Sequence, residues 1–125
     1  MRVDTRPRKR NSPRIAEKSA PGFLQWLRGR ECMASGIRGQ APGCDGKVQA
    51  AHVDYAGDKG VGTKVSDRYA VPLCQRHHAW QHQHGWPRFE RAWFGVEGVA
   101  LTAAAAFWKG WPGRIAWERK LERGE

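Results

Sequence analysis

A short run that begins at Cys74, CQRHHAWQHQH, constrains this chain most, because it contains one of the three cysteines and four of the five histidines. Nothing in it after the cysteine breaks a helix, so we predict a helix over residues 75–85. Cys74 and His77 lie three residues apart on one face of that helix and can bind one ion. His78 and His82 lie four residues apart on a neighbouring face, so they form a second, separate pair of metal ligands.

The length and the cysteine count indicate how the first pair is completed. A chain of 125 residues is expected to form one small domain with appended segments, and a domain of that size benefits from a stabilising metal. No apolar stretch after Met1 resembles a secretory signal, so we expect a reduced protein in the cytoplasm. In that compartment Cys32, Cys44, Cys74 and His77 predict a Cys3His zinc site, rather than a disulfide with a spare thiol.

The charge of the chain indicates its partner. A formal net charge of +10 predicts attraction to polyanions, of which nucleic acid is the most common. Residues 1–18 are expected to form a flexible basic arm in which Arg8, Lys9 and Arg10 contact phosphates, a solvated tail being the alternative. The longest apolar run near the C-terminus, residues 99–108, is about half of what a bilayer span requires, so no membrane association is expected.

Periodicity and turn signals predict an α+β protein. Strands are expected over residues 48–54, ending near His52, and over residues 67–73, directly before the histidine-rich helix, which gives a ββα arrangement around an ion. We expect this core to lie in a domain of residues 19–90, followed by a helical extension of residues 91–125. Further helices are expected over residues 21–28, 87–94, 96–108 and 111–121.

Three stretches of this core carry a family resemblance. They are AHV (51–53), GVGTKVSD (60–67) and VPLCQRHH (71–78), the last followed by His82 and Gly85. In these stretches the chain resembles the HNH, or ββα-metal, endonuclease superfamily, in particular its small phage and prophage members. The resemblance covers approximately residues 32–85.

The resemblance implies a role for each of the conspicuous polar residues. His52 takes the position of the general base. Asp67 falls near the family's middle asparagine and either orients the base or binds metal. His78 and His82 hold the catalytic divalent ion, and the four Cys3His residues form the structural zinc site that many members carry.

The chain departs from the family pattern at three places. Position 51 is Ala, where many members have a metal-binding Asp or His, so that ligand comes from elsewhere or is replaced by water. Position 67 is Asp in place of Asn. Cys32 and Cys44 are much further apart than the two cysteines of a two-residue knuckle.

These residues predict a metal-dependent endonuclease that hydrolyses DNA. A divalent ion, Mg²⁺ or a transition metal, acts as Lewis acid and template, while His52 accepts the proton of the attacking water. Lys64 and Arg76 are expected to contact phosphates. The expected role is in phage recombination, DNA processing or packaging, and whether a recombination or packaging protein recruits the chain stays open. The alternatives are a noncatalytic zinc-stabilised nucleic-acid-binding module and, because of Ala51, a degenerate nuclease.

Overall fold

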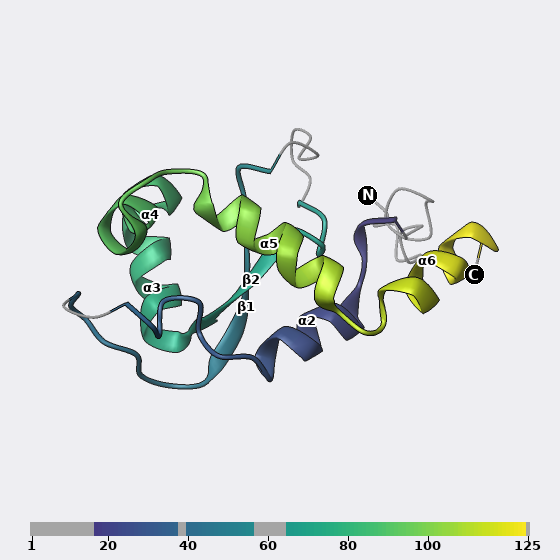
Figure 1. Cartoon of the computed structure of the whole chain (residues 1–125), viewed down its shortest axis with the longest axis horizontal. Helices are drawn as coiled ribbons and strands as arrows, with labels where there is room; N and C mark the ends of the chain where they lie inside the picture. The colour runs from purple at the N-terminus through teal and green to yellow at the C-terminus, as the bar shows by residue number, and fades with distance from the viewer. Residues whose placement is uncertain (1–16, 38–39, 57–64, 125) are drawn as a thin grey trace, which may run out of the picture.

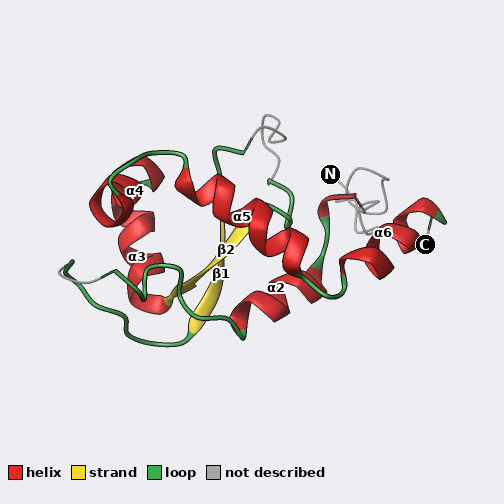
Figure 2. Cartoon of the chain, viewed as in Figure 1, coloured by secondary structure: helices red, strands yellow, loops and turns green. Residues whose placement is uncertain are grey.

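The computed structural model describes residues 17–37, 40–56 and 65–124 of the chain (Figure 1). It is a small mixed α+β protein, which confirms the expected fold class at that level (Figure 2). The elements follow the predicted order: α2 (Pro21–Arg28), β1 (Val48–His52), β2 (Ala70–Cys74), α3 (Gln75–His84), α4 (Trp86–Phe94), α5 (Val99–Gly110) and α6 (Arg114–Glu122).

The two strands pair antiparallel, with Val48 opposite Cys74 and His52 opposite Ala70. Every residue of β2 is buried, which accounts for its continuous apolar sequence. This strand begins three residues later than predicted, because the backbone N–H of Tyr69 donates to the carbonyl of Ser66 at 3.0 Å and closes a turn before it. Asp67 therefore lies in a turn at the edge of the sheet.

Local sequence signals set the ends of the helices. A proline occupies the first turn of α2, where its missing N–H costs nothing, and Phe23 and Leu27 form the buried stripe of that helix. The start of α5 is capped by a side chain of the preceding helix α4, because the Ala100 N–H donates to the buried carboxylate of Glu90 at 2.8 Å. None of the helices in the described part of the chain is long and apolar enough to cross a bilayer.

One helix covers the sheet and two pairs of helices lie at its two ends. In Figure 1, α5 passes over the strands, α3 and α4 lie at one end, and α2 and α6 lie at the other. The larger core cluster joins the sheet to α4 and α5 through Val71, Leu73 and Phe89. A smaller cluster around Phe23 and Trp108 joins α2 to α5. This packing fixes the start of α3, and with it the histidine-rich run, against the edge of the sheet.

Candidate metal centre and histidine cluster

Four side chains from separate segments converge at the start of α3. They are Cys32 after α2, Cys44 before β1, Cys74 at the end of β2 and His77 in the first turn of α3, and their ligand atoms all lie within 4.8 Å of one another. Within the described ranges, this is the one group of three or more His, Cys, Asp or Glu side chains that could hold a metal ion. The structure thus supports a metal-binding site at the four residues expected from the sequence.

The distances at His77 fit zinc. Its Nδ1 lies 3.4 Å, 3.6 Å and 3.3 Å from the sulfurs of Cys32, Cys44 and Cys74. With Zn–S bonds of about 2.3 Å and Zn–N bonds of about 2.0–2.1 Å, a tetrahedron has an N···S edge of about 3.6 Å. One ring nitrogen carries at most one hydrogen and cannot donate to three sulfurs. Three near-equal N···S distances therefore fit four ligands arranged around one shared ion.

Backbone groups orient these ligands. The Nε2–H of His77 donates to the carbonyl of Pro42 at 2.8 Å, which leaves the lone pair on Nδ1, facing the sulfurs. The Met33 N–H donates to the Pro72 carbonyl at 2.9 Å and so joins the Cys32 segment to β2. The Arg76 N–H donates to the Asp45 carbonyl at 3.1 Å and joins the Cys44 segment to α3.

The pKa values of the three thiols show how the site treats their charged forms. Burial raises the pKa of the Cys32 thiol. Cys44 is exposed as a residue, but reduced hydration around its sulfur and the neighbouring Cys32 raise its pKa to about 12. Burial also opposes ionisation of Cys74, yet its pKa is lowered, because the backbone N–H groups of His77 and Asp45 stabilise the thiolate. Three thiolates this close would repel one another, and a bound divalent ion would offset that repulsion.

A second pair of imidazoles lies one helical turn apart on α3. The Nε2 atoms of His78 and His82 are 3.1 Å apart, within hydrogen-bond distance of each other and close enough for both to bind one ion. The Nδ1–H of His78 donates to Oε1 of Gln49 at 2.7 Å, which leaves a lone pair on its Nε2, the atom that faces Nε2 of His82. Burial, then the charges of His82 and His52, lower the pKa of His78, which keeps its ring neutral.

His52 is held by Asp67. The Nε2 atom of His52 lies 2.9 Å from Oδ1 of Asp67. The indole N–H of Trp86 donates to the backbone carbonyl of His52 at 3.1 Å. The other oxygen of Asp67 accepts a hydrogen bond of 2.8 Å from the N–H of Ala20, at the start of α2. With both oxygens engaged in this way, Asp67 is placed to orient His52 and to leave its Nδ1 lone pair available.

The face of β1 toward α3 differs from the family pattern. Ala51 is fully buried in the larger core cluster and offers no ligand atom. Among the described residues, no third His, Cys, Asp or Glu joins His78 and His82 in a metal-ligating group. Gln49 shares the Ala51 face because side chains alternate along a strand, and its contact with His78 was missed from the sequence. The i, i+2 spacing of Gln49 and Ala51 was the sequence signal that could have predicted this contact.

Of the five basic residues predicted to contact phosphate, one lies within the described part of the structure. Arg76 lies beside the Cys3His group, where its guanidinium donates to Asp45 at 2.9 Å in an exposed ion pair. Lys64, Arg8, Lys9 and Arg10 lie outside the described residues.

Comparison with known proteins places the chain in a family. No curated protein matches its sequence. No solved structure matches its fold. Residues 3–105 match the family described as "Protein of unknown function (DUF968)". Since that match covers more than half of the 125 residues, the chain belongs to this family.

Proposed function

We propose that this protein is a metal-dependent endonuclease of the HNH type that hydrolyses phosphodiester bonds of DNA. The observation that carries the proposal is the surplus of oriented imidazoles. A structural zinc site uses four ligands, and Cys32, Cys44, Cys74 and His77 supply them. His78, His82 and His52 are additional to that set, and each makes a contact that orients its ring.

The roles follow from which ring nitrogens carry a lone pair. His78 and His82 would hold a divalent ion, which when bound supplies Lewis-acid stabilisation of phosphate charge. His52 accepts a proton from the attacking water at Nδ1, because Nε2–H is hydrogen-bonded to Asp67. Asp67 keeps that tautomer and stabilises the imidazolium that results. The net charge of +10 favours association with the DNA backbone.

The donor set also favours one class of metal. Two imidazole ligands suit Zn²⁺, Ni²⁺, Co²⁺ or Mn²⁺ better than Mg²⁺, which prefers oxygen ligands and keeps several waters. With two protein ligands, an ion at His78 and His82 retains coordination positions for water and phosphate oxygens. We therefore expect cleavage to be stronger with a transition metal than with Mg²⁺.

A noncatalytic zinc-stabilised DNA-binding module is the second candidate. The buried Ala51 favours it, because the position that carries a metal ligand in many HNH nucleases has none here. In that case the basic surface would bind DNA and His52 with Asp67 would stabilise the junction between β1 and α2.

Cleavage of supercoiled plasmid by zinc-loaded protein tests the proposal. Mn²⁺, Ni²⁺, Co²⁺ and Mg²⁺ are added separately, and nicked product is quantified over time. His52→Ala and His82→Ala should each lower the rate at least a hundredfold, since each removes a group in contact with the reacting atoms or the ion. His84→Ala is the matched control, because His84 lies on the same helix and its ring packs at a tilt against Trp80 and not against His78 or His82.

The outcomes separate the two candidates. Metal-dependent nicking that survives in His84→Ala but is lost in His52→Ala supports the nuclease. DNA binding without nicking under every metal supports the noncatalytic module. Nicking that persists in both His52→Ala and His82→Ala assigns the activity to a contaminant and refutes the proposed site. Zinc content is measured in every variant, so that a lost structural ion is not mistaken for a lost catalytic group.

A further inference from the structure

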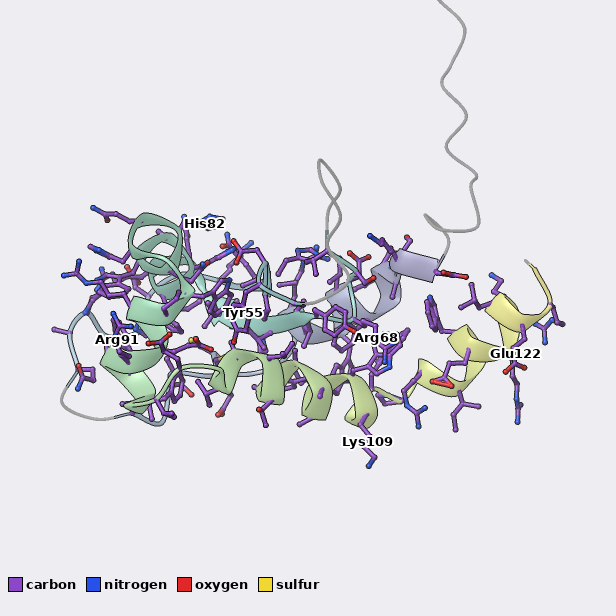
Figure 3. All side chains as sticks on the ribbon, turned by 90° about the horizontal axis from the view of Figure 1, so that it is seen from above. Tyr55, Arg68, His82, Arg91, Lys109 and Glu122 are labelled. Atoms are coloured by element: carbon purple, nitrogen blue, oxygen red, sulfur yellow. The ribbon has the colours of Figure 1, made fainter. Side chains whose placement is uncertain are left out.

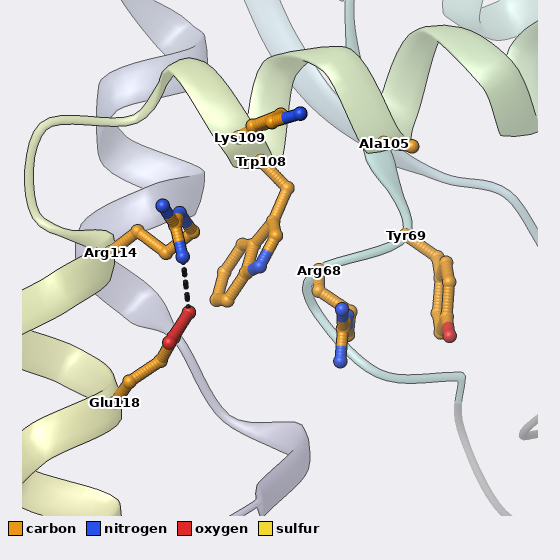
Figure 4. Close-up of a pocket in the computed structure, with 7 residues that line it drawn as sticks. All are labelled: Arg68, Tyr69, Ala105, Trp108, Lys109, Arg114 and Glu118. Atoms are coloured by element: carbon orange, nitrogen blue, oxygen red, sulfur yellow. Dashed lines mark hydrogen bonds and ion pairs between the residues drawn. The ribbon is translucent and has the colours of Figure 1, made fainter.

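A cavity of about 300 Å³ opens between the turn before β2 and the helices α5 and α6 (Figure 4). Neither metal centre includes any of its lining residues. It is lined by Arg68, Tyr69, Ala105, Trp108, Lys109, Arg114 and Glu118. Figure 3 places Arg68 and Lys109 at the same position along the long axis of the molecule, with His82 toward the other end.

The lining is cationic. Arg68, Lys109 and Arg114 contribute three positive charges against the single carboxylate of Glu118. That carboxylate accepts a hydrogen bond of 2.7 Å from Arg114, one helical turn away, and so offsets one of the three charges. An anion that enters this cavity meets the remaining two charges.

The lining is also aromatic. The guanidinium carbon of Arg68 lies 5.5 Å from the ring centre of Tyr69 and 5.4 Å from that of Trp108, so the cation is held between two ring systems. The Trp108 indole is fixed in turn by edge-on contacts with Phe23 at 5.1 Å and Trp117 at 5.1 Å. Trp108 is therefore fixed and largely buried, and Arg68 covers part of both rings, so the cavity presents the remaining ring surface beside positive charge.

A nucleotide has this combination of chemistry, because it joins a phosphate to a flat base. A volume of about 300 Å³ lies at the lower end of ligand pockets. It admits one nucleotide unit, whereas the bases of a duplex are stacked and paired and cannot enter a pocket one at a time. Arg68 directly follows Asp67, the partner of His52, so a strand bound here passes close to the candidate base.

We propose that this cavity binds one nucleotide unit of single-stranded DNA, with the phosphate at Lys109 and Arg68 and the base against Tyr69 and Trp108. The binding itself stands on the cavity alone. The role of that strand as substrate rests on the proposed function. The protein would then prefer DNA with single-stranded segments, such as ends, flaps or melted regions.

Salt-dependent binding tests the cavity. Full-length zinc-loaded protein without added divalent metal is titrated into a fluorescent 20-nucleotide single strand and into the corresponding duplex. Lys109→Ala should reduce the slope of log K against log salt by about 0.7, the contribution of one single-strand phosphate, which weakens binding about fivefold at 0.1 M salt. Lys120→Ala is the matched control, because Lys120 is an exposed lysine of α6 outside the lining. It should leave the slope unchanged.

A second readout does not depend on affinity for a long strand. In NMR spectra of the seven tryptophan indole N–H groups, deoxyadenosine monophosphate should shift Trp108, while Trp93 in the other core cluster stays fixed. Inorganic phosphate is the comparison ligand. Arg68→Gln should reduce the Trp108 response to the nucleotide at least fivefold, with thermal melting used to confirm that the variant is folded.

Each outcome bears on the proposal. Equal losses in Lys109→Ala and Lys120→Ala, or a Trp108 shift produced as well by phosphate alone, would overturn the nucleotide site. Duplex bound as tightly as single strand would overturn the preference. Plasmid cleavage together with unchanged binding in Lys109→Ala would support the proposed function and contradict the nucleotide site. Selective single-strand binding without any cleavage would support the nucleotide site and contradict the proposed function.

Discussion

Replacement of Cys44 by Ser is the sharpest test of the Cys3His centre. Cys44 is exposed, so Cys44→Ser removes one sulfur ligand without opening a cavity in the core. The sulfur lies 3.6 Å from Nδ1 of His77, within the tetrahedral N···S range. If this atom binds the ion, its loss weakens zinc binding and uncouples the Cys44 segment from α3.

The size of the effect follows from binding linkage. An ion present at a thousandfold above its dissociation constant stabilises the folded state by about 4 kcal/mol. For a chain of 125 residues, about 4 °C per kcal/mol gives a fall of about 16 °C in Tm when that binding is lost. Ser35→Ala, at an exposed serine of the same connecting segment, should change Tm by no more than about 2 °C.

Thermal melts at fixed free zinc and metal analysis measure this directly. In the cobalt-substituted protein, Cys44→Ser should also lose about one third of the thiolate-to-metal charge-transfer intensity, since one of three sulfurs is removed. A Cys44→Ser protein with the zinc content and Tm of Ser35→Ala would refute the four-ligand centre and leave Cys44 as an ordinary surface thiol.

Three further predictions concern the second metal pair and the loop that supports the first. Gln49→Leu removes the acceptor of the His78 Nδ1–H. Calorimetry should show Ni²⁺ or Mn²⁺ binding weakened about 10- to 100-fold, with zinc content unchanged. Unchanged affinity would exclude an orienting role for Gln49. Gly46→Ala should destabilise by about 2 kcal/mol or more in denaturant melts, because Gly46 has φ +83° and a Cβ would lie 2.6 Å from Gln75 Cβ, whereas Gly43→Ala meets open space and should change little. Because the pKa of His78 is lowered by burial, the unfolded chain binds more protons here, so this group costs stability as pH falls from about 6.5 through the folded pKa. A His78 ring that titrates at or above about 6.5 by NMR would contradict this sign.

Local sequence was sufficient for the elements that depend on near neighbours. The proline start and apolar stripe of α2 predicted the helix over residues 21–28, and the unbroken polar run after Cys74 predicted α3. The i, i+3 and i, i+4 spacings also predicted which histidines share a face of that helix. Strand ends were predicted less well, since the turn closed between Ser66 and Tyr69 depends on backbone hydrogen bonding that the residue pattern does not reveal.

The sequence by itself determined the ligand types, the helical pairing of Cys74 with His77 and of His78 with His82, and the basic character of the chain, because these follow from composition and a fixed helical period. The sequence also assigned Cys32 and Cys44 to the first pair and gave orientation of His52 as one of two roles for Asp67. Only the tertiary structure decided how these segments meet, that Gln49 contacts His78, and that a cationic cavity forms around Arg68. Those contacts join segments far apart in sequence. Their positions are fixed by packing and backbone hydrogen bonds, which no local spacing encodes.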